Sequence, residues 1–398
     1  MKKTGKRFFI AAFIAALVIL VGVSVAAAQP ALTEMEKLGK AIFFDKNLSL
    51  NGNQSCATCH DPDAGWTGPD EAINAHGAVY EGSIPGAFGD RKPPSAAYAT
   101  QSPILHVDRK GVFTGGNFWD GRATGETLGS PSAEQAKGPF LNPKEQALPS
   151  PTELVARVCA ADYGDLFEQV WGDEICDEIN VSAAYDAIGL SIAAYEASSE
   201  VNAFTSKYDY SLVSKATLTK EERKGFALFQ GKGKCKLCHV SSGAQPLFTD
   251  FTFDNLGIPT NPENPAYIAD PNFVDPGLGG FLASRQDYAA FADANMGMHK
   301  VPTLRNVGLG LPALTKAYGH NGYFKSLWGI VHFYNTRDAL DTCPGAYTET
   351  DALAANCWPA PEVAENVNTA ELGNLGLTYA EEQAIVAFLK TLSDGYMP

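Results

Sequence analysis

The fold of this 398-residue chain is decided by two stretches, Cys56-Ala57-Thr58-Cys59-His60 and Cys235-Lys236-Leu237-Cys238-His239. Both follow the pattern Cys-x-x-Cys-His, in which two thiols one helical turn apart can add to the two vinyl groups of one haem. A thioredoxin-type redox pair would not need the histidine, and a zinc site would not spread its cysteines so far apart in the sequence. The two stretches therefore predict two covalently bound haems c, with His60 and His239 as ligands of the irons.

The two motifs belong to an internal duplication. Thr33-Glu34-Met35-Glu36 and Thr219-Lys220-Glu221-Glu222 are capping boxes that predict the start of a helix before each motif. From each of these threonines, Gly follows at the sixth position, Ala at the eighth and Phe at the tenth. An amphipathic helix is also predicted behind each motif, one after Ser182 and one after a third capping box at Thr378, with apolar residues at helical spacing: Ile188, Ile192, Tyr195, Ile385, Phe388, Leu389 and Leu392.

A helix before each haem motif and a closing helix behind it is the layout of a cytochrome c domain. The predicted fold class is therefore mainly α, with two cytochrome c-like domains at residues 29–210 and 211–398, each carrying one haem c. Long stretches rich in Gly and Pro, residues 61–120 and 240–310, are expected to wrap the haems as loops. A chain of this length suits two modest cores better than one.

The N-terminus predicts export. Residues 1–28 begin with four basic residues and continue with 21 uncharged residues from Phe8 to Ala28, which end in Ala26-Ala27-Ala28. This is the pattern of a cleaved signal peptide, although the uncharged stretch is also long enough for an uncleaved membrane anchor. Either reading places the remaining chain outside the cytoplasm.

The other cysteines and the charge fit an exported protein. An even remainder of four cysteines implies disulfides in an oxidising compartment, and the short separations favour Cys159–Cys176 and Cys343–Cys357. The chain after residue 28 contains 26 Lys and Arg residues and 45 Asp and Glu residues, which gives a formal charge of −19. This charge argues against a nucleic-acid partner and would suit a basic protein partner, but a solvated acidic surface without a partner explains it equally well.

The order of motifs resembles the bacterial di-haem cytochrome c peroxidase/MauG family over essentially the whole exported chain. Three further blocks carry the resemblance: Phe118-Trp119-Asp120-Gly121-Arg122-Ala123, Glu134-Gln135-Ala136-Lys137-Gly138-Pro139 and Val301-Pro302-Thr303-Leu304-Arg305-Asn306. The resemblance implies an oxidoreductase that consumes hydrogen peroxide. Peroxide would react at the N-terminal haem, and the C-terminal haem would pass in electrons or share the oxidising equivalents.

The resemblance also implies the residues around the first haem. Glu145 would be the acid–base that moves a proton between the peroxide oxygens, Gln135 would orient the peroxide, and Pro139 would line the same pocket. Trp119 resembles the tryptophan that relays electrons between the haems, although a core tryptophan would occupy the same position. His76, sixteen residues after His60, lies where the family's peroxidases often have a displaceable sixth ligand, and its alternative is an ordinary surface histidine.

The sixth ligand of the second iron separates two branches of the family. The family's peroxidases have a Met fourteen residues after the His of a His-x-Gly turn, whereas MauG-like members have a Tyr. In this chain the turn is His320-Asn321-Gly322, and Tyr334 stands fourteen residues after His320. A phenolate stabilises ferric and higher-valent iron, whereas a thioether raises the potential. Met296 and Met298 remain alternative ligands.

One block departs from the family pattern. Members commonly hold a calcium ion between the domains with the Asn of an Arg-Asn-x-Pro segment and with carbonyls near the His-x-Gly turn. Here the segment is Arg91-Lys92-Pro93-Pro94, and a lysine beside calcium would be repulsive. Thr315 and Ala317 could still offer carbonyls, so a calcium ion is possible but doubtful.

Three functions are compatible with these residues. The first is a peroxidase that draws electrons from a small cytochrome or copper protein. The second is a MauG-like enzyme that uses peroxide and high-valent haem iron to oxidise a residue of a partner protein. The third is an electron-transfer cytochrome without catalysis, against which Gln135 and Glu145 argue, because a pure carrier needs no group that handles protons.

Overall fold

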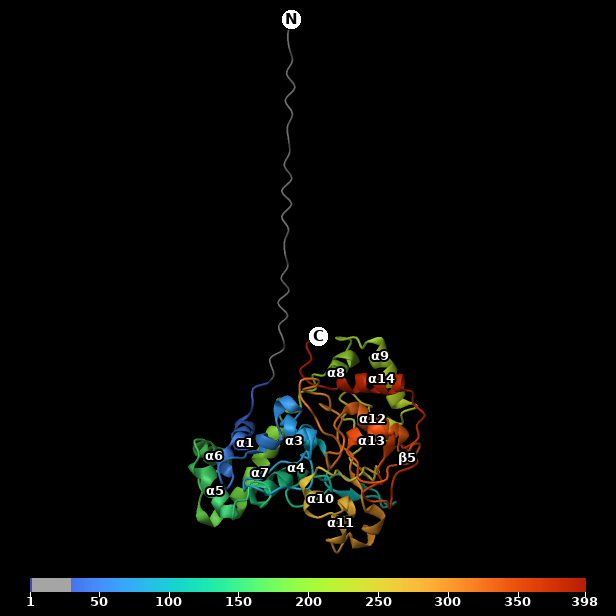
Figure 1. Ribbon diagram of the computed structural model, residues 1–398. Coiled ribbons are helices and arrows are strands. Elements are labelled where there is room, and N and C mark those ends of the chain that lie inside the picture. The colour runs from blue at the N-terminus through green and yellow to red at the C-terminus, as the bar shows by residue number, and fades with distance from the viewer. Residues whose placement is uncertain (2–29) are drawn as a thin grey trace. The chain divides into compact units, whose positions relative to one another are not determined.

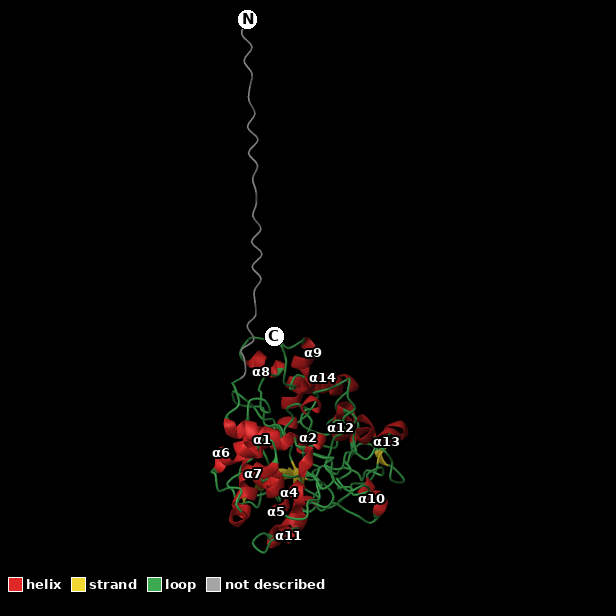
Figure 2. Ribbon diagram, turned by 90° about the vertical axis from the view of Figure 1, so that its left-hand side faces the viewer, coloured by secondary structure: helices red, strands yellow, loops and turns green. Residues whose placement is uncertain are grey.

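Helices and loops form nearly all of the described chain, as Figure 1 and Figure 2 show. The computed structural model describes Met1 and residues 30–398, so the predicted leader lies outside the described residues apart from Met1. No helix in the described part is both long and apolar enough to cross a membrane. The α-helices are α1 Glu34–Phe44, α2 Cys56–Cys59, α3 Glu71–Ala75, α4 Pro131–Leu141, α5 Pro151–Ala160, α6 Gly164–Trp171, α7 Val181–Ala197, α8 Lys207–Leu212, α9 Lys220–Gln230, α10 Pro265–Ala269, α11 Gly277–Ala283, α12 Leu327–Thr336, α13 Glu349–Ala355 and α14 Tyr379–Lys390.

The strands are short, and each pairs with only one other. Two pairs are antiparallel and one is parallel: β1 His106–Val107 with β2 Phe113–Thr114, β3 Phe253–Asp254 with β4 His299–Lys300, and, in parallel, β5 Asp341–Thr342 with β6 Cys357–Trp358. The prediction of a mainly α fold is therefore confirmed.

Two helix pairs repeat the same packing in the two halves. Helix α1 packs against α7, and α9 packs against α14. The predicted capping boxes are present at Thr33, Thr219 and Thr378. In each box the threonine hydroxyl accepts a hydrogen bond from the backbone N–H of the glutamate three residues later. The side chain of that glutamate accepts a hydrogen bond from the backbone N–H of the threonine. Helix α7 begins slightly earlier than expected, so that Ser182 lies inside its first turn.

The repeated glycine allows the close approach within each pair. A Cβ at Gly39 would collide with the backbone carbonyl of Ser191 in α7, and a Cβ at Gly225 would collide with that of Ala384 in α14. The helices of both pairs can therefore approach closely only because the sixth residue after each capping threonine has no side chain.

Replacing Gly225 by Ala should destabilise the protein by about 1–3 kcal/mol, because the new methyl group has to displace a packed helix. On an exposed helical face, the same change would stabilise by about 1 kcal/mol. Chemical denaturation of the wild type, Gly225→Ala and Ala227→Val measures the difference, with Ala227 as an exposed position on the same helix. An unchanged or higher free energy of unfolding for Gly225→Ala would contradict the packing argument.

Each helix pair has its own hydrophobic core. The first core gathers buried residues between Leu38 and Val201, and the second gathers buried residues between Tyr208 and Leu392. Contacts also cross between the halves: the Tyr98 hydroxyl donates to Asp394 at 2.6 Å, and the Arg91 guanidinium donates to Asp275 at 2.6 Å. From Ala31 onward the chain forms one compact unit. The division into domains at residues 210 and 211 stays a prediction.

Both predicted disulfides are present. Cys159 at the end of α5 is bonded to Cys176 beyond α6, and Cys343 is bonded to Cys357 in β6. The remaining four cysteines, those of the two Cys-x-x-Cys-His motifs, are free thiols.

Candidate active site

The first half contains a cavity of about 160 Å³ between the first motif and α4. Helix α2, helix α4 and the loop that follows α4 all contribute residues to its lining. Of the residues predicted for the first haem and its peroxide pocket, the cavity is lined by Cys56, Cys59, His60, Trp119, Gln135, Pro139 and Glu145. Segments far apart in the sequence thus bring these residues together.

Burial sets the protonation states of the motif side chains. The thiols are unpaired, and burial raises the pKa of Cys59 to about 12. Burial lowers the pKa of His60 to about 4, so this imidazole is neutral, which is the form that binds a metal. Its Nδ1 lies 3.2 Å from the carbonyl oxygen of Trp66, and the corresponding Nδ1 of His239 lies 2.8 Å from that of Phe248. Such contacts orient the ring and leave Nε2 as the metal-binding atom.

The carboxyl group of the half-buried residue Glu145 lies at the wall of the first cavity. Its position is held through the backbone, where its N–H donates to Asn142 at 2.9 Å and its carbonyl accepts from Ser83 at 2.6 Å. Burial raises the pKa of Glu145, and the nearby Arg122 opposes this rise. A carboxyl group of this kind can hold or release a proton nearer to neutral pH than an exposed one.

Glu196 is a further carboxyl group in the same cavity, it is buried, and it was not predicted from the sequence. It lies on α7 with 4% of its surface exposed, and burial raises its pKa to about 8. The signal was present in the sequence, because Ile188, Ile192 and Glu196 follow one another at intervals of four residues. They therefore share the buried face of one helix.

His76 is not among the residues that line the first cavity. It follows α3 at the surface, where its side chain is 69% exposed and its Nδ1 lies 2.8 Å from a carboxylate oxygen of Glu263. The short helix α3, capped by Asp70, ends at this point and directs the ring toward the second half of the chain. His76 as a displaceable ligand of the first iron stays a prediction, and in this structure its ring contacts Glu263.

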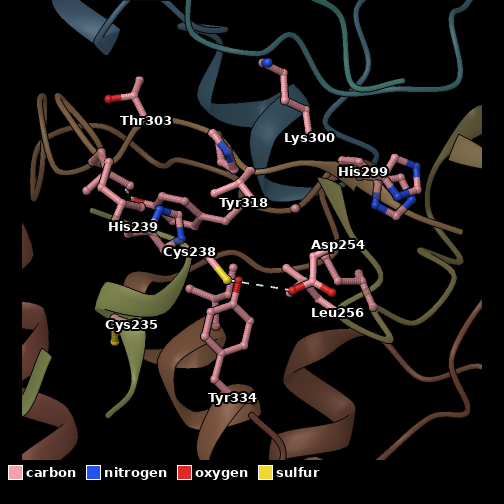
Figure 3. Close-up of a pocket in the computed structure, with 18 of the residues that line it drawn as sticks. Cys235, Cys238, His239, Asp254, Leu256, His299, Lys300, Thr303, Tyr318 and Tyr334 are labelled. Atoms are coloured by element: carbon pink, nitrogen blue, oxygen red, sulfur yellow. Dashed lines mark hydrogen bonds between the residues drawn. The ribbon is translucent and has the colours of Figure 1, made fainter. Parts of the chain in front are cut away.

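The second cavity, of about 220 Å³, lies beside the second motif and is lined by Cys235, Cys238, His239 and Tyr334. Burial lowers the pKa of His239, which favours its neutral form. Figure 3 shows the Tyr334 ring extending from α12 toward Cys238. Neither Met296 nor Met298 lines the cavity, and Met298 packs instead against a separate apolar cluster that includes Leu278.

Trp119 lines both cavities. Its indole N–H donates to the carbonyl oxygen of Lys92 at 2.8 Å, and its own carbonyl oxygen accepts from the backbone N–H of Lys300 at 2.8 Å. These contacts hold the half-buried ring at the boundary between the first and second halves.

The residues at the expected calcium site do not fit a calcium ion. The side chain of Lys92 presents an ammonium group where the family has an amide oxygen. The carbonyl oxygen of Thr315 accepts a hydrogen bond from the Asn74 side chain at 3.0 Å, and the neighbouring Lys316 places a second ammonium group nearby. Calcium requires oxygen ligands, and these groups offer hydrogen-bond donors and positive charge.

Comparisons with known proteins agree with this arrangement. Residues 33–217 match the family model for di-haem cytochrome c peroxidase. The chain is 36% identical to the methylamine utilization protein MauG of Paracoccus denitrificans (strain Pd 1222), over 92% of this chain and 90% of that protein. It is 30% identical to the cytochrome c551 peroxidase of Nitrosomonas europaea, over 74% of this chain and 71% of that protein.

A solved structure is similar over nearly the whole chain. The crystal structure of the diheme peroxidase BthA from Burkholderia thailandensis E264 superposes with a TM-score of 0.75 at 30% identity, and the match covers 93% of this chain and 88% of that one. The chain therefore belongs to the di-haem cytochrome c peroxidase and MauG family and is an oxidoreductase with two haem groups.

Proposed function

We propose that this protein is exported to the periplasm and binds both haems covalently as haem c. The thiols of Cys56 and Cys59 would attach the first haem, and those of Cys235 and Cys238 the second. His60 and His239 would bind the two irons through Nε2. When bound, the haems would supply the redox chemistry that the side chains lack. The free thiols beside both cavities support this proposal, because the other four cysteines are bonded in pairs.

Hydrogen peroxide would be consumed in the first cavity. In this proposal the Glu145 carboxylate would accept a proton from one peroxide oxygen and return it to the other, so that the O–O bond breaks and water leaves. The haem, when bound, would supply the two electrons that this cleavage requires. The side-chain amide of Gln135 orients the peroxide by hydrogen bonding, and Pro139 helps to exclude bulk water. The shared lining of one cavity by these three residues supports the assignment.

The oxidising equivalents from hydrogen peroxide would be used to oxidise a residue of a partner protein. The observation that carries this choice is that Tyr334 lines the second cavity, whereas Met296 and Met298 do not. A phenolate ligand favours oxidised iron, and a thioether favours reduced iron. Trp119, which lines both cavities, would relay electrons between the two sites.

A second candidate is a peroxidase that receives electrons from a small cytochrome or copper protein. The similarity to a cytochrome c551 peroxidase and to the diheme peroxidase BthA favours it. The two candidates differ in the expected ligand of the second iron and in the state of the first iron at rest.

Electron paramagnetic resonance of the resting diferric protein tests the choice. We expect a high-spin first haem and a low-spin second haem whose signal changes in Tyr334→Phe and is unchanged in the matched variant Met298→Leu. If the signal of the second haem is unchanged in Tyr334→Phe but changes in Met298→Leu or Met296→Leu, Tyr334 is not the ligand. A low-spin first haem at rest would favour the peroxidase and would support His76 as a candidate ligand.

A further inference from the structure

Two buried lysines lie between the halves of the molecule, and neither belongs to the peroxide chemistry. We propose that the ammonium groups of Lys92 and Lys316 form a built-in cation site at the junction of the two halves, in place of a bound calcium ion, and that Lys316 provides the direct link between the halves. This inference depends on neither the ligands of the irons nor the reaction.

Lys316 is surrounded by carbonyl oxygens. Its Nζ donates to Ala64 at 2.7 Å, to Leu309 at 3.0 Å and to Asn306 at 3.2 Å, and only 4% of the residue is exposed. An ammonium group has three N–H donors, so the three oxygens satisfy it completely. Lys316 and two of the acceptors belong to the second half, whereas Ala64 belongs to the first. The ammonium group therefore links the halves directly.

The Lys92 ammonium group is held by the first half alone, and the link of this residue to the second half is made by its backbone. Its Nζ donates to the Thr67 hydroxyl at 2.8 Å and to the Pro93 carbonyl at 2.9 Å, and 9% of the residue is exposed. Its backbone N–H donates to the carbonyl oxygen of His320, in the second half, at 2.8 Å. The backbone of this one residue also holds the Trp119 indole, so the placement of the tryptophan depends on the same junction.

Both ammonium groups lack a carboxylate partner. None of the ion pairs among residues 30–398 includes Lys92 or Lys316. Burial lowers the pKa of Lys92 to about 8 and that of Lys316 to about 7, and the charge of Lys92 contributes to the lowering at Lys316. Both groups are therefore charged together below about pH 7, and this is the range in which the cation site is complete. The hydrogen-bond acceptors of both ammonium groups are uncharged oxygens. Backbone carbonyl and hydroxyl oxygens are also ligands that a calcium ion takes.

A calcium ion would be repelled at this junction. It would add two positive charges beside two ammonium groups in a region from which water is largely excluded, where the repulsion is stronger than in solution. The Asn74 side chain also donates to the Thr315 carbonyl, which removes one oxygen that calcium could use. The lysines differ from an ion in one important respect, because a chelator cannot remove them.

Calcium removal from the holoprotein is the first test. We expect the melting temperature to stay the same after dialysis against EGTA and after addition of millimolar CaCl₂, and isothermal titration with CaCl₂ to show no binding. Lys92 and Lys316 should resist acetylation in the folded protein, whereas the exposed Lys110 should react. A melting temperature that falls with EGTA and recovers with CaCl₂ would overturn the proposal.

Substitution of the lysines is the second test. Lys316→Met and Lys92→Met should each lower the melting temperature by several degrees, whereas Lys110→Met should not change it. The double variant Lys92→Asn/Lys316→Met leaves oxygens without a cation, so added CaCl₂ should raise its melting temperature but not that of the wild type. If neither single variant melts below Lys110→Met, the ammonium groups do not stabilise the junction. If the variants fail to fold, the acetylation and chelation results on the wild type still decide.

Discussion

Replacing Glu145 by Gln is expected to lower kcat/KM for hydrogen peroxide by about 100-fold or more, the usual contribution of a positioned acid–base. The amide keeps the size of the side chain and can still form hydrogen bonds, but it cannot accept a proton from peroxide and return it. Stopped-flow mixing of the purified holoprotein with peroxide measures the rate. A suitable control is Glu153→Gln, a glutamate of α5 that pairs with Arg157 and lines neither cavity.

The pH profile separates proton transfer from a packing defect. A base must be ionised to act, so the wild-type rate should fall as the pH drops through the pKa of Glu145. Because burial raises that pKa, the fall should begin above the range of an exposed carboxyl group. Glu145→Gln should lack this step, and Glu196→Gln should keep it. Turnover equal to the wild type in Glu145→Gln, with the same pH step, would show that Glu145 is not the proton carrier.

The parts of the fold that the sequence predicted correctly are those encoded by local signals. A capping box marks the start of a helix within four residues of sequence. The three predicted capping boxes are present at Thr33, Thr219 and Thr378. The repeated glycines at Gly39 and Gly225 were noticed as part of the duplication. Their reason, the close approach of a second helix, concerns residues more than 100 positions away and is visible only in the structure.

The candidate site was predictable where one motif carries the chemistry and less so where contacts are long-range. The Cys-x-x-Cys-His motifs and the blocks around Trp119 and Gln135 were identified from the sequence, and the structure brings their residues to the two cavities. His76 was placed by its distance from His60 along the chain, which says nothing of the partner Glu263 that meets it from the second half. Lys92 was considered only as a missing calcium ligand, because the Thr67 hydroxyl that accepts from its ammonium group lies far away in the sequence.

Removing one pair of motif cysteines should remove one covalent haem and leave the other. We expect Cys56→Ser/Cys59→Ser to retain a single haem per chain after denaturation, because thioether bonds survive unfolding and coordination does not. Peroxide turnover should be lost, since the first cavity is where we place that chemistry. Cys235→Ser/Cys238→Ser should also retain one haem but keep the first cavity intact. Haem staining on denaturing gels and the pyridine haemochrome absorbance measure the haem content.

The second disulfide supplies the matched control, because its removal also deletes two cysteines. Cys343→Ser/Cys357→Ser should keep both haems and lose about 3 kcal/mol of stability, the value for a closed loop of this length. Two covalent haems in Cys56→Ser/Cys59→Ser would mean that other residues attach the first haem. A haem lost from the disulfide variant would mean that the haem count reports on folding rather than on attachment. The contrast between the two pairs therefore tests the assignment of the four free thiols separately from the stability of the fold.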